Sequence, residues 1–155
     1  MKHVLFVCLG NIARSTMAEA IFVQMISQRQ LADQIEVDSA GTSNEETGKR
    51  PHLGTQEILR QHDIPFDWIR ARQITPSDFE WADYIITMDQ HNLRHLRQIA
   101  PNQLAKDKIS LAYDILPDRM GTEIPDPWYT QRFDDTYQHL MATLPKWLDK
   151  IENEL

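Results

Sequence analysis

A chain of 155 residues with a 41% hydrophobic share can bury one sizeable core without a disulfide or a metal. Its formal net charge of −7 argues against a general nucleic-acid binder, because affinity for phosphate backbones depends on clustered Lys and Arg. Cys8 is the only cysteine, which excludes an internal disulfide, and no stretch approaches the roughly 20 apolar residues of a membrane span. We therefore expect one cytosolic domain over residues 1–155, with no nucleic-acid partner and no membrane span.

The first half of the chain alternates between strand and helix patterns. The apolar run 2–7 predicts a strand, which is followed by a turn-like segment and by a helix from Ser15 onward. Apolar residues recur on that helix at three- and four-residue spacing, which gives it one apolar face. The alternating run 35–40 predicts a second strand, the polar run 41–51 an exposed loop, and the run 53–62 another helix.

The second half continues the alternation. Residues 84–88 form a compact apolar run typical of a buried strand, and residues 109–113 predict a fourth strand. A helix is expected over 91–99, with one apolar face made of Leu93, Leu96 and Ile99. The end of the chain predicts a terminal helix in which Pro145 causes a kink or a restart near Leu144, because proline lacks a backbone donor. The apolar face of this helix comprises Phe133, Tyr137, Leu140, Leu144, Leu148 and Ile151.

Repeated strand–helix units with nearly continuous apolar strands favour a parallel sheet that is covered on both faces. The predicted fold class is therefore α/β, a single-domain three-layer α/β/α arrangement around a central four-stranded parallel sheet. In such sheets, ligands bind beyond the carboxyl ends of the strands. The loop that follows the first strand is the first place to look for a functional site.

That loop runs from a strand into a helix and reads Cys8-Leu9-Gly10-Asn11-Ile12-Ala13-Arg14-Ser15. It places a thiol and a guanidinium at opposite ends of a short cradle, in which backbone N–H groups and the helix N-terminus can hold an anion. Arg14 can bind two phosphate oxygens with its planar fork. The same field favours thiolate over thiol at Cys8, and Ser15 can donate a hydrogen bond to the sulfur. We predict a phosphate site with Cys8 as a nucleophile.

The segment Val7–Ser15 resembles the phosphate loop of the low-molecular-weight protein-tyrosine phosphatases. Further blocks match that family in the expected order and extend the resemblance over nearly the whole chain. They are Asp38-Ser39-Ala40-Gly41-Thr42, Ala71-Arg72-Gln73-Ile74-Thr75, Met88-Asp89 with Asn92-Leu93, and Ile124-Pro125-Asp126-Pro127-Trp128-Tyr129. A lone Cys-(x)5-Arg pattern has only moderate specificity, whereas five ordered blocks are highly specific.

The resemblance implies a metal-independent and cofactor-independent phosphatase that acts on phosphotyrosine-containing proteins. Asp126 would protonate the leaving phenolic oxygen and then activate the water that hydrolyses a cysteinyl-phosphate. Trp128 and Tyr129 would flank an aromatic substrate ring. Ser39 would join Asn11 in a hydrogen-bond network that supports the loop.

A simpler interpretation stands beside each of these roles. A free cysteine is often just a small buried hydrophobe, and an Asp-Pro pair is more often a turn than an acid. Trp128 and Tyr129 are equally compatible with packing their loop onto the core. Asn11 also suits a left-handed turn, Ser39 suits a strand end, and Arg72 is interpreted as a surface charge. The loop context favours the catalytic roles.

Three positions depart from the family pattern. Many relatives carry a second cysteine just before the arginine, where this chain has Ala13. Relatives often place an aromatic residue on the cleft wall, where this chain has Ser43-Asn44-Glu45-Glu46, and this acidic wall is expected to disfavour acidic phosphopeptides. A histidine that supports the phosphate loop in many relatives is missing near Trp68 and Ile69.

Two alternative functions stay open. A protein-arginine phosphatase would use the same chemistry, but such relatives typically carry threonine where this loop has Ile12. A non-catalytic phosphopeptide-binding module would keep Arg14 and lose Cys8 or Asp126, whereas both are present here. Arsenate reductases of this fold need additional cysteines, which the chain lacks. We expect the protein to be a monomer or a weak dimer.

Overall fold

The computed structural model describes all residues from 1 to 155 and contains one four-stranded parallel sheet. The strand order is β2-β1-β3-β4. The strands are β1 (Lys2–Cys8), β2 (Ile35–Gly41), β3 (Tyr84–Thr87) and β4 (Ile109–Leu111). The prediction of a central parallel sheet with four strands is confirmed.

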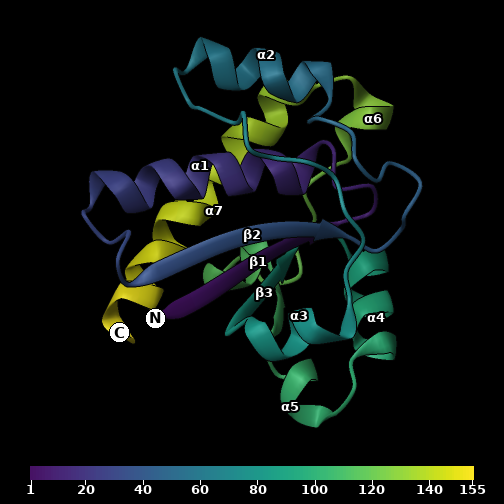
Figure 1. Ribbon diagram of the computed structural model, residues 1–155, viewed down its shortest axis with the longest axis vertical. Coiled ribbons are helices and arrows are strands. Elements are labelled where there is room, and N and C mark those ends of the chain that lie inside the picture. Colours follow the sequence, from purple (N-terminus) through teal and green to yellow (C-terminus); the bar gives the residue numbers. More distant parts are fainter.

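Helices cover both faces of this sheet (Figure 1). One layer contains α1, α2 and α7, and the other contains α3, α4 and α5. None of the helices is long and apolar enough to cross a bilayer. The helices are α1 (Arg14–Gln28), α2 (Leu53–Gln61), α3 (Pro76–Trp81), α4 (Gln90–Ile99), α5 (Gln103–Lys106), α6 (Pro127–Thr130) and α7 (Phe133–Asn153), with a 3₁₀ turn at Ala112–Ile115.

The alternating side chains of β1 separate two hydrophobic cores. Val4 and Phe6 pack in the core beneath α1 and α7, whereas Leu5 and Val7 pack in the core beneath α3 and α4. All four are fully buried, as expected for a central strand with helices on both faces. The three-layer α/β/α prediction is therefore confirmed.

The order of the strands creates a crevice at the carboxyl end of β1. The chain passes from β1 through α1 to β2 on one side, and β3 lies on the other side of β1. Cys8 is the last residue of β1 and is paired with Gly41, the last residue of β2. This is the switch point at which open α/β sheets bind ligands. The sheet thus delivers Cys8 to the place where a site was expected.

The alternative that the helix restarts near Leu144 is wrong, because α7 is one continuous helix from Phe133 to Asn153 with Pro145 inside it. Leu144, Trp147 and Leu148 are buried on either side of the proline. Each buried apolar side chain of this size contributes roughly 1.5–3 kcal/mol, which together outweighs the roughly 3 kcal/mol cost of proline in a helix interior. Tertiary packing overrides the local signal.

Two smaller expectations also need correction. Ile99 was expected on a buried face, but it is 43% exposed at the end of α4, past Leu93 and Leu96. The fourth strand ends at Leu111 rather than at residue 113. Its end is set by the carboxylate of Asp114, which accepts the N–H of Leu111 at 2.9 Å and starts a 3₁₀ turn.

Gly41 is required by the close approach of β2 to the loop after β1. A β-carbon at this position would lie 2.8 Å from the carbonyl oxygen of Leu9 and 3.2 Å from the backbone nitrogen of Asn11. Both neighbours are backbone atoms, so an added methyl group must displace the loop itself. Glycine is therefore required at position 41 because there is no space for a side chain, and not because of its φ angle.

We predict that Gly41→Ala lowers the free energy of unfolding by about 1–3 kcal/mol, the usual cost of overpacking a tight interior. Urea denaturation monitored by circular dichroism measures this change. Asn44→Ala, at an exposed position of the following loop, is the matched control and should change stability by less than about 0.5 kcal/mol. Equal stability of the Gly41→Ala variant and the wild type would contradict the prediction, because it would show that the loop moves to accommodate the methyl group without a cost in free energy.

Candidate active site

The phosphate loop, residues 8–15, is tied to the rest of the protein through its carbonyl groups. The carbonyl oxygen of Cys8 accepts from the N–H of Thr42 at 2.9 Å, that of Leu9 from Ser43 at 3.0 Å, and that of Ile12 from His52 at 2.7 Å. None of the backbone N–H groups of residues 9–14 donates to an acceptor within the protein. Because these hydrogen bonds hold the carbonyl groups away from the centre of the loop, the N–H groups are available to an anionic ligand.

Asn11 is the centre of a buried network behind the loop. Its φ angle is 56°, in the left-handed region, and its side chain is fully buried. Its Nδ2 donates to Ser15 Oγ at 2.8 Å and to Ser39 Oγ at 3.0 Å. Its Oδ1 accepts from the backbone N–H of Arg72 at 3.0 Å, which fixes the orientation of the amide. Both interpretations of Asn11 are therefore correct: it makes the turn and it supports the loop.

The network ends at a buried carboxylate. Ser39 Oγ donates to Glu19 Oε1 at 2.5 Å, and Trp68 Nε1 donates to Glu19 Oε2 at 2.8 Å. An ionised carboxylate only accepts hydrogen bonds, so Ser39 gives its proton to Glu19 and accepts the bond from Asn11. This direction agrees with the orientation of the Asn11 amide, which the N–H of Arg72 fixes.

At the other end, the same logic reaches Cys8. Asn11 uses one amide proton on each serine, so the hydroxyl of Ser15 is an acceptor toward Asn11. Ser15 Oγ lies 3.0 Å from Cys8 Sγ, and its proton is left to point at the sulfur. The predicted contact between Ser15 and Cys8 is present, and its direction is set by the orientation of the Asn11 amide.

Glu19 and Trp68 are the members of this network that sequence reasoning missed. Trp68 lies outside α1, and its indole N–H reaches Glu19. One signal was available: Glu19 stands four residues after Ser15 on the same helix, hence on the same face, and it is 4% exposed. A carboxylate on a buried face needs partners.

Arg14 is held rigidly at the far end of the loop. It is 3% exposed, and its Nη1 donates to Asp89 Oδ2 at 2.9 Å and to the carbonyl oxygen of Ile124 at 3.0 Å. Burial raises the pKa of Asp89, but the N–H of Asn92 and the charge of Arg14 outweigh burial and lower it overall. Asp89 therefore stays charged and orients the guanidinium. Asp89 and Asn92 had appeared only as a matching block, without a role.

Asp126 immediately precedes α6 as its N-cap residue, and the segment around it is stiff. Its carboxylate accepts from the N–H of Trp128 at 3.0 Å and lies 3.5 Å from Arg14 Nη2. Pro125 and Pro127 flank it and restrict the backbone on both sides. The side chain is 22% exposed, so it contacts solvent as well as Arg14. The structure thus brings together Cys8, Arg14 and Asp126, which lie far apart in the sequence.

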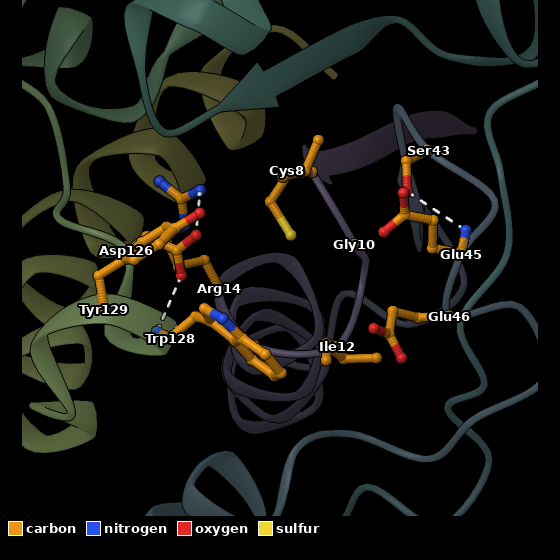
Figure 2. Close-up of a pocket in the computed structure, with 12 residues that line it drawn as sticks. Cys8, Gly10, Ile12, Arg14, Ser43, Glu45, Glu46, Asp126, Trp128 and Tyr129 are labelled. Atoms are coloured by element: carbon orange, nitrogen blue, oxygen red, sulfur yellow. Dashed lines mark hydrogen bonds and ion pairs between the residues drawn. The ribbon is translucent and has the colours of Figure 1, made fainter.

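These side chains open into one cavity of about 190 Å³ (Figure 2). Trp128 and Tyr129 are 53% and 78% exposed, so the alternative that they pack onto the core is wrong. Asn11, Ser15 and Ser39 stand behind the cavity as support. The residues that line it are Cys8, Leu9, Gly10, Ile12, Ala13, Arg14, Ser43, Glu45, Glu46, Asp126, Trp128 and Tyr129.

The interpretation of Arg72 as a surface charge is wrong. Its guanidinium donates to Asp38 and to Asp78, at 2.9 Å in each case. Its backbone N–H donates to Asn11, and its carbonyl oxygen accepts from the N–H of Gly41 at 2.8 Å. Arg72 therefore connects the end of β2 to the phosphate loop.

The buried carboxyl group of Glu19 gives stability a specific dependence on pH. Burial has the largest effect on the pKa of Glu19 and raises it above the ordinary value of 4.5. Hydrogen bonds from Ser39 and Trp68 lower this pKa, but they do not cancel the effect of burial. The folded state therefore binds this proton more tightly than the unfolded state does. Stability from this group is fully present below the ordinary pKa and is lost as the pH rises through the raised pKa.

We predict that the free energy of unfolding of the wild type, minus that of Glu19→Gln, falls as the pH rises from 4 through the raised pKa of Glu19 and then becomes constant. Glutamine has the same shape and does not titrate, so all other groups cancel in the difference. Urea unfolding of both proteins over a series of pH values measures it. A difference that stays constant over the whole series would contradict a raised pKa.

The profile of the family described as low molecular weight phosphotyrosine protein phosphatase matches residues 3–155. The low molecular weight protein-tyrosine-phosphatase YfkJ of Bacillus subtilis is 42% identical over 154 residues, which cover 99% of this chain and 98% of that protein. The corresponding PtpA of Staphylococcus saprophyticus is 43% identical, with coverage of 97% and 94%.

Solved structures agree with these similarities. The crystal structure of YfkJ from Bacillus subtilis superposes with a TM-score of 0.95 at 42% identity, over 99% of this chain and 96% of that one. The crystal structure of DARP, a drosophila arginine phosphatase, has a TM-score of 0.86 at 33% identity, over 97% and 99%. With the family profile matched over nearly its whole length, the chain belongs to the low molecular weight protein-tyrosine phosphatase family.

Proposed function

We propose that the protein hydrolyses phosphotyrosine in proteins, and aryl phosphates in general, through a cysteinyl-phosphate formed on Cys8. One observation carries the proposal: Cys8 Sγ lies at the base of a loop whose N–H groups, at residues 9–14, have no acceptor in the protein. Arg14 and Asp126 line the same cavity. A nucleophile, an anion cradle and a proton donor are the three parts that phosphoryl transfer needs.

In the first step, the thiolate of Cys8 attacks phosphorus while the bond to the phenolic oxygen breaks. Asp126 gives its proton to that oxygen, so the leaving group departs as a neutral phenol. The free N–H groups of Leu9, Gly10, Ile12 and Ala13 and the guanidinium of Arg14 hold the equatorial oxygens of the transition state. Because Asp89 already binds Arg14 Nη1 at 2.9 Å, the guanidinium needs little reorganisation.

In the second step, water attacks the phosphorus of the cysteinyl-phosphate and Asp126, now ionised, takes a proton from that water. The sulfur–phosphorus bond breaks, inorganic phosphate forms, and Cys8 leaves as a thiolate. Ser15 supports this departure, because its hydroxyl lies 3.0 Å from the sulfur and donates to it. The network from Asn11 to Glu19 holds that hydroxyl in place.

An aromatic substrate is supported by the shape and lining of the cavity. Trp128 and Tyr129 are exposed beside Asp126 and can flank a phenyl ring. Ile12 lines the floor and offers no polar group to a phosphoguanidinium. The relatives at 42% and 43% identity are named tyrosine phosphatases, whereas the drosophila arginine phosphatase is 33% identical.

The remaining parts of the proposal concern the context of the protein. A cytosolic location suits a mechanism that needs Cys8 as a reduced thiol. Residues 1–155 would act as one phosphatase domain, as a monomer or a weak dimer, with phosphotyrosine-containing proteins as partners and no nucleic acid, metal or cofactor. Gel filtration with light scattering determines the oligomeric state.

We predict that Cys8→Ser lowers kcat/KM for a phosphotyrosine peptide by about 10³-fold or more, because a serine hydroxyl is a far weaker nucleophile than a thiolate. Steady-state assays with EDTA present should compare phosphotyrosine, phosphoarginine and phosphoserine peptides. Retained binding of inorganic phosphate by the variant is the control for an intact loop. If the wild-type protein turns over the phosphoarginine peptide faster than the phosphotyrosine peptide, the substrate class is phosphoarginine. If the wild-type protein binds the phosphopeptides without hydrolysing any of them, it is a binding module.

We predict that Asp126→Asn lowers kcat/KM by about 10²–10⁴-fold for phenyl phosphate and by less for p-nitrophenyl phosphate. Nitrophenolate is a good leaving group and has little need of a proton, whereas phenolate depends on one. Assays of the two substrates with the same enzyme preparation give the ratio. An equal loss on both would remove Asp126 from the role of general acid.

A further inference from the structure

We propose that this phosphatase selects phosphotyrosine that is flanked by lysine or arginine, through an acidic wall made of Glu45 and Glu46. The inference rests on the proposed hydrolysis of phosphotyrosine and names its substrate class. The cavity has two sides (Figure 2): Asp126, Trp128 and Tyr129 form one, and the acidic wall faces them across Cys8. A site for a phosphate dianion thus carries two further carboxylates that the chemistry does not use.

The acidic wall is fixed to the phosphate loop and is no mobile surface tail. Glu46 packs on Gly10, where a β-carbon would lie 3.4 Å from Glu46 Cγ, and its side chain is only 20% exposed. The N–H of Ser43 donates to Leu9 at 3.0 Å, and the N–H of Gly48 donates to the carbonyl oxygen of Ala71 at 2.8 Å. Both ends of the segment are therefore anchored, which holds its charges at a defined place beside the phosphate.

The charge on the acidic wall is balanced only in part from within the protein. Lys49 Nζ pairs with Glu46 Oε2 at 2.5 Å, which leaves Glu45 as the carboxylate of the wall that has no cationic partner. Arg50 pairs with Asp67. Glu45 lines the cavity, is exposed, and has no cationic partner within 4.0 Å. Its carboxylate is available to a cation that a substrate brings.

A substrate side chain beside the phosphotyrosine meets this wall. An aspartate or a glutamate there would be repelled by the unpaired carboxylate of Glu45, whereas a lysine or an arginine would pair with it. Exposed ion pairs change an equilibrium by about 1.5- to 5-fold each. One such pair, at Glu45, therefore gives roughly a 1.5- to 5-fold preference for a basic over a neutral flank, and the effect is weaker at high salt.

A flanking side chain fits these observations better than phosphoarginine does. In phosphoarginine, the positive charge lies next to the phosphorus, where it would face the guanidinium of Arg14 and the apolar side chain of Ile12. A flanking lysine carries its charge at the end of a flexible stem, which can reach Glu45 at the cavity mouth. The phosphoryl group and the cation then bind in separate places.

The test uses the full chain and three phosphotyrosine peptides that differ only in flanking lysine, alanine or glutamate. We expect kcat/KM in the order lysine, alanine, glutamate, with the lysine-to-glutamate ratio falling as salt rises from 20 to about 300 mM. In Glu45→Gln/Glu46→Gln the ratio should approach one, and in Glu45→Lys it should fall below one. Glu80→Gln, an exposed position on α3, removes the same charge elsewhere and should keep the wild-type ratio.

Each result has a definite meaning. Equal turnover of the lysine and glutamate peptides by the wild type would overturn the inference, as would a wild-type ratio in the doubly substituted variant. Faster turnover of a phosphoarginine peptide than of any phosphotyrosine peptide would overturn it as well, and would assign the carboxylates to a phosphoguanidinium. Hydrolysis of p-nitrophenyl phosphate distinguishes a failure of the substrate preference from a failure of the proposed function. If the wild-type protein hydrolyses neither this compound nor any of the peptides, the proposed phosphatase activity itself is refuted.

Discussion

The site depends on one side-chain amide, that of Asn11. Its two protons hold Ser15 and Ser39, and its oxygen holds the backbone of Arg72, so a single group connects the phosphate loop, the end of β2 and the segment before α3. Few other side chains combine two donors with an acceptor at this reach and also tolerate a left-handed φ of 56°. The shape of the loop and the direction of its hydrogen bonds are thus set by the same residue.

An acidic protein needs a local source of positive potential to bind a phosphate, and here that source is mostly the backbone. The chain carries a net charge of −7, yet the loop presents unpaired N–H groups at the N-terminal end of α1 together with the buried Arg14. Asp89 fixes that guanidinium, and Asp126 lies 3.5 Å from it. The field is therefore confined to the cradle, which is why carboxylates can stand on the adjoining wall without abolishing the site.

The parts that sequence predicted correctly are those in which the signal is local. Cys8, Arg14 and Ser15 lie within one strand–loop–helix unit, and the apolar runs of β1 and β3 are contiguous, so spacing and composition were enough. Glu19, Trp68 and Arg72 act through contacts with segments far away in the chain, and local spacing does not reveal those partners. The predicted restart of the helix at Pro145 was wrong for the converse reason. Proline locally favours the end of a helix, but the burial of the neighbouring apolar side chains stabilises a continuous helix more strongly.

The site brings together several structural features that are unfavourable in the absence of a ligand. Asn11 adopts a left-handed conformation, Glu19 is a carboxylate at 4% exposure, and the loop N–H groups lack acceptors. Each of these costs free energy in the unliganded protein, and the two cores on either side of the sheet offset that cost. A phosphate dianion supplies the acceptors that the loop lacks. The groups that make the free loop unfavourable are thus the ones that bind substrate, so its preorganisation and its affinity have the same physical origin.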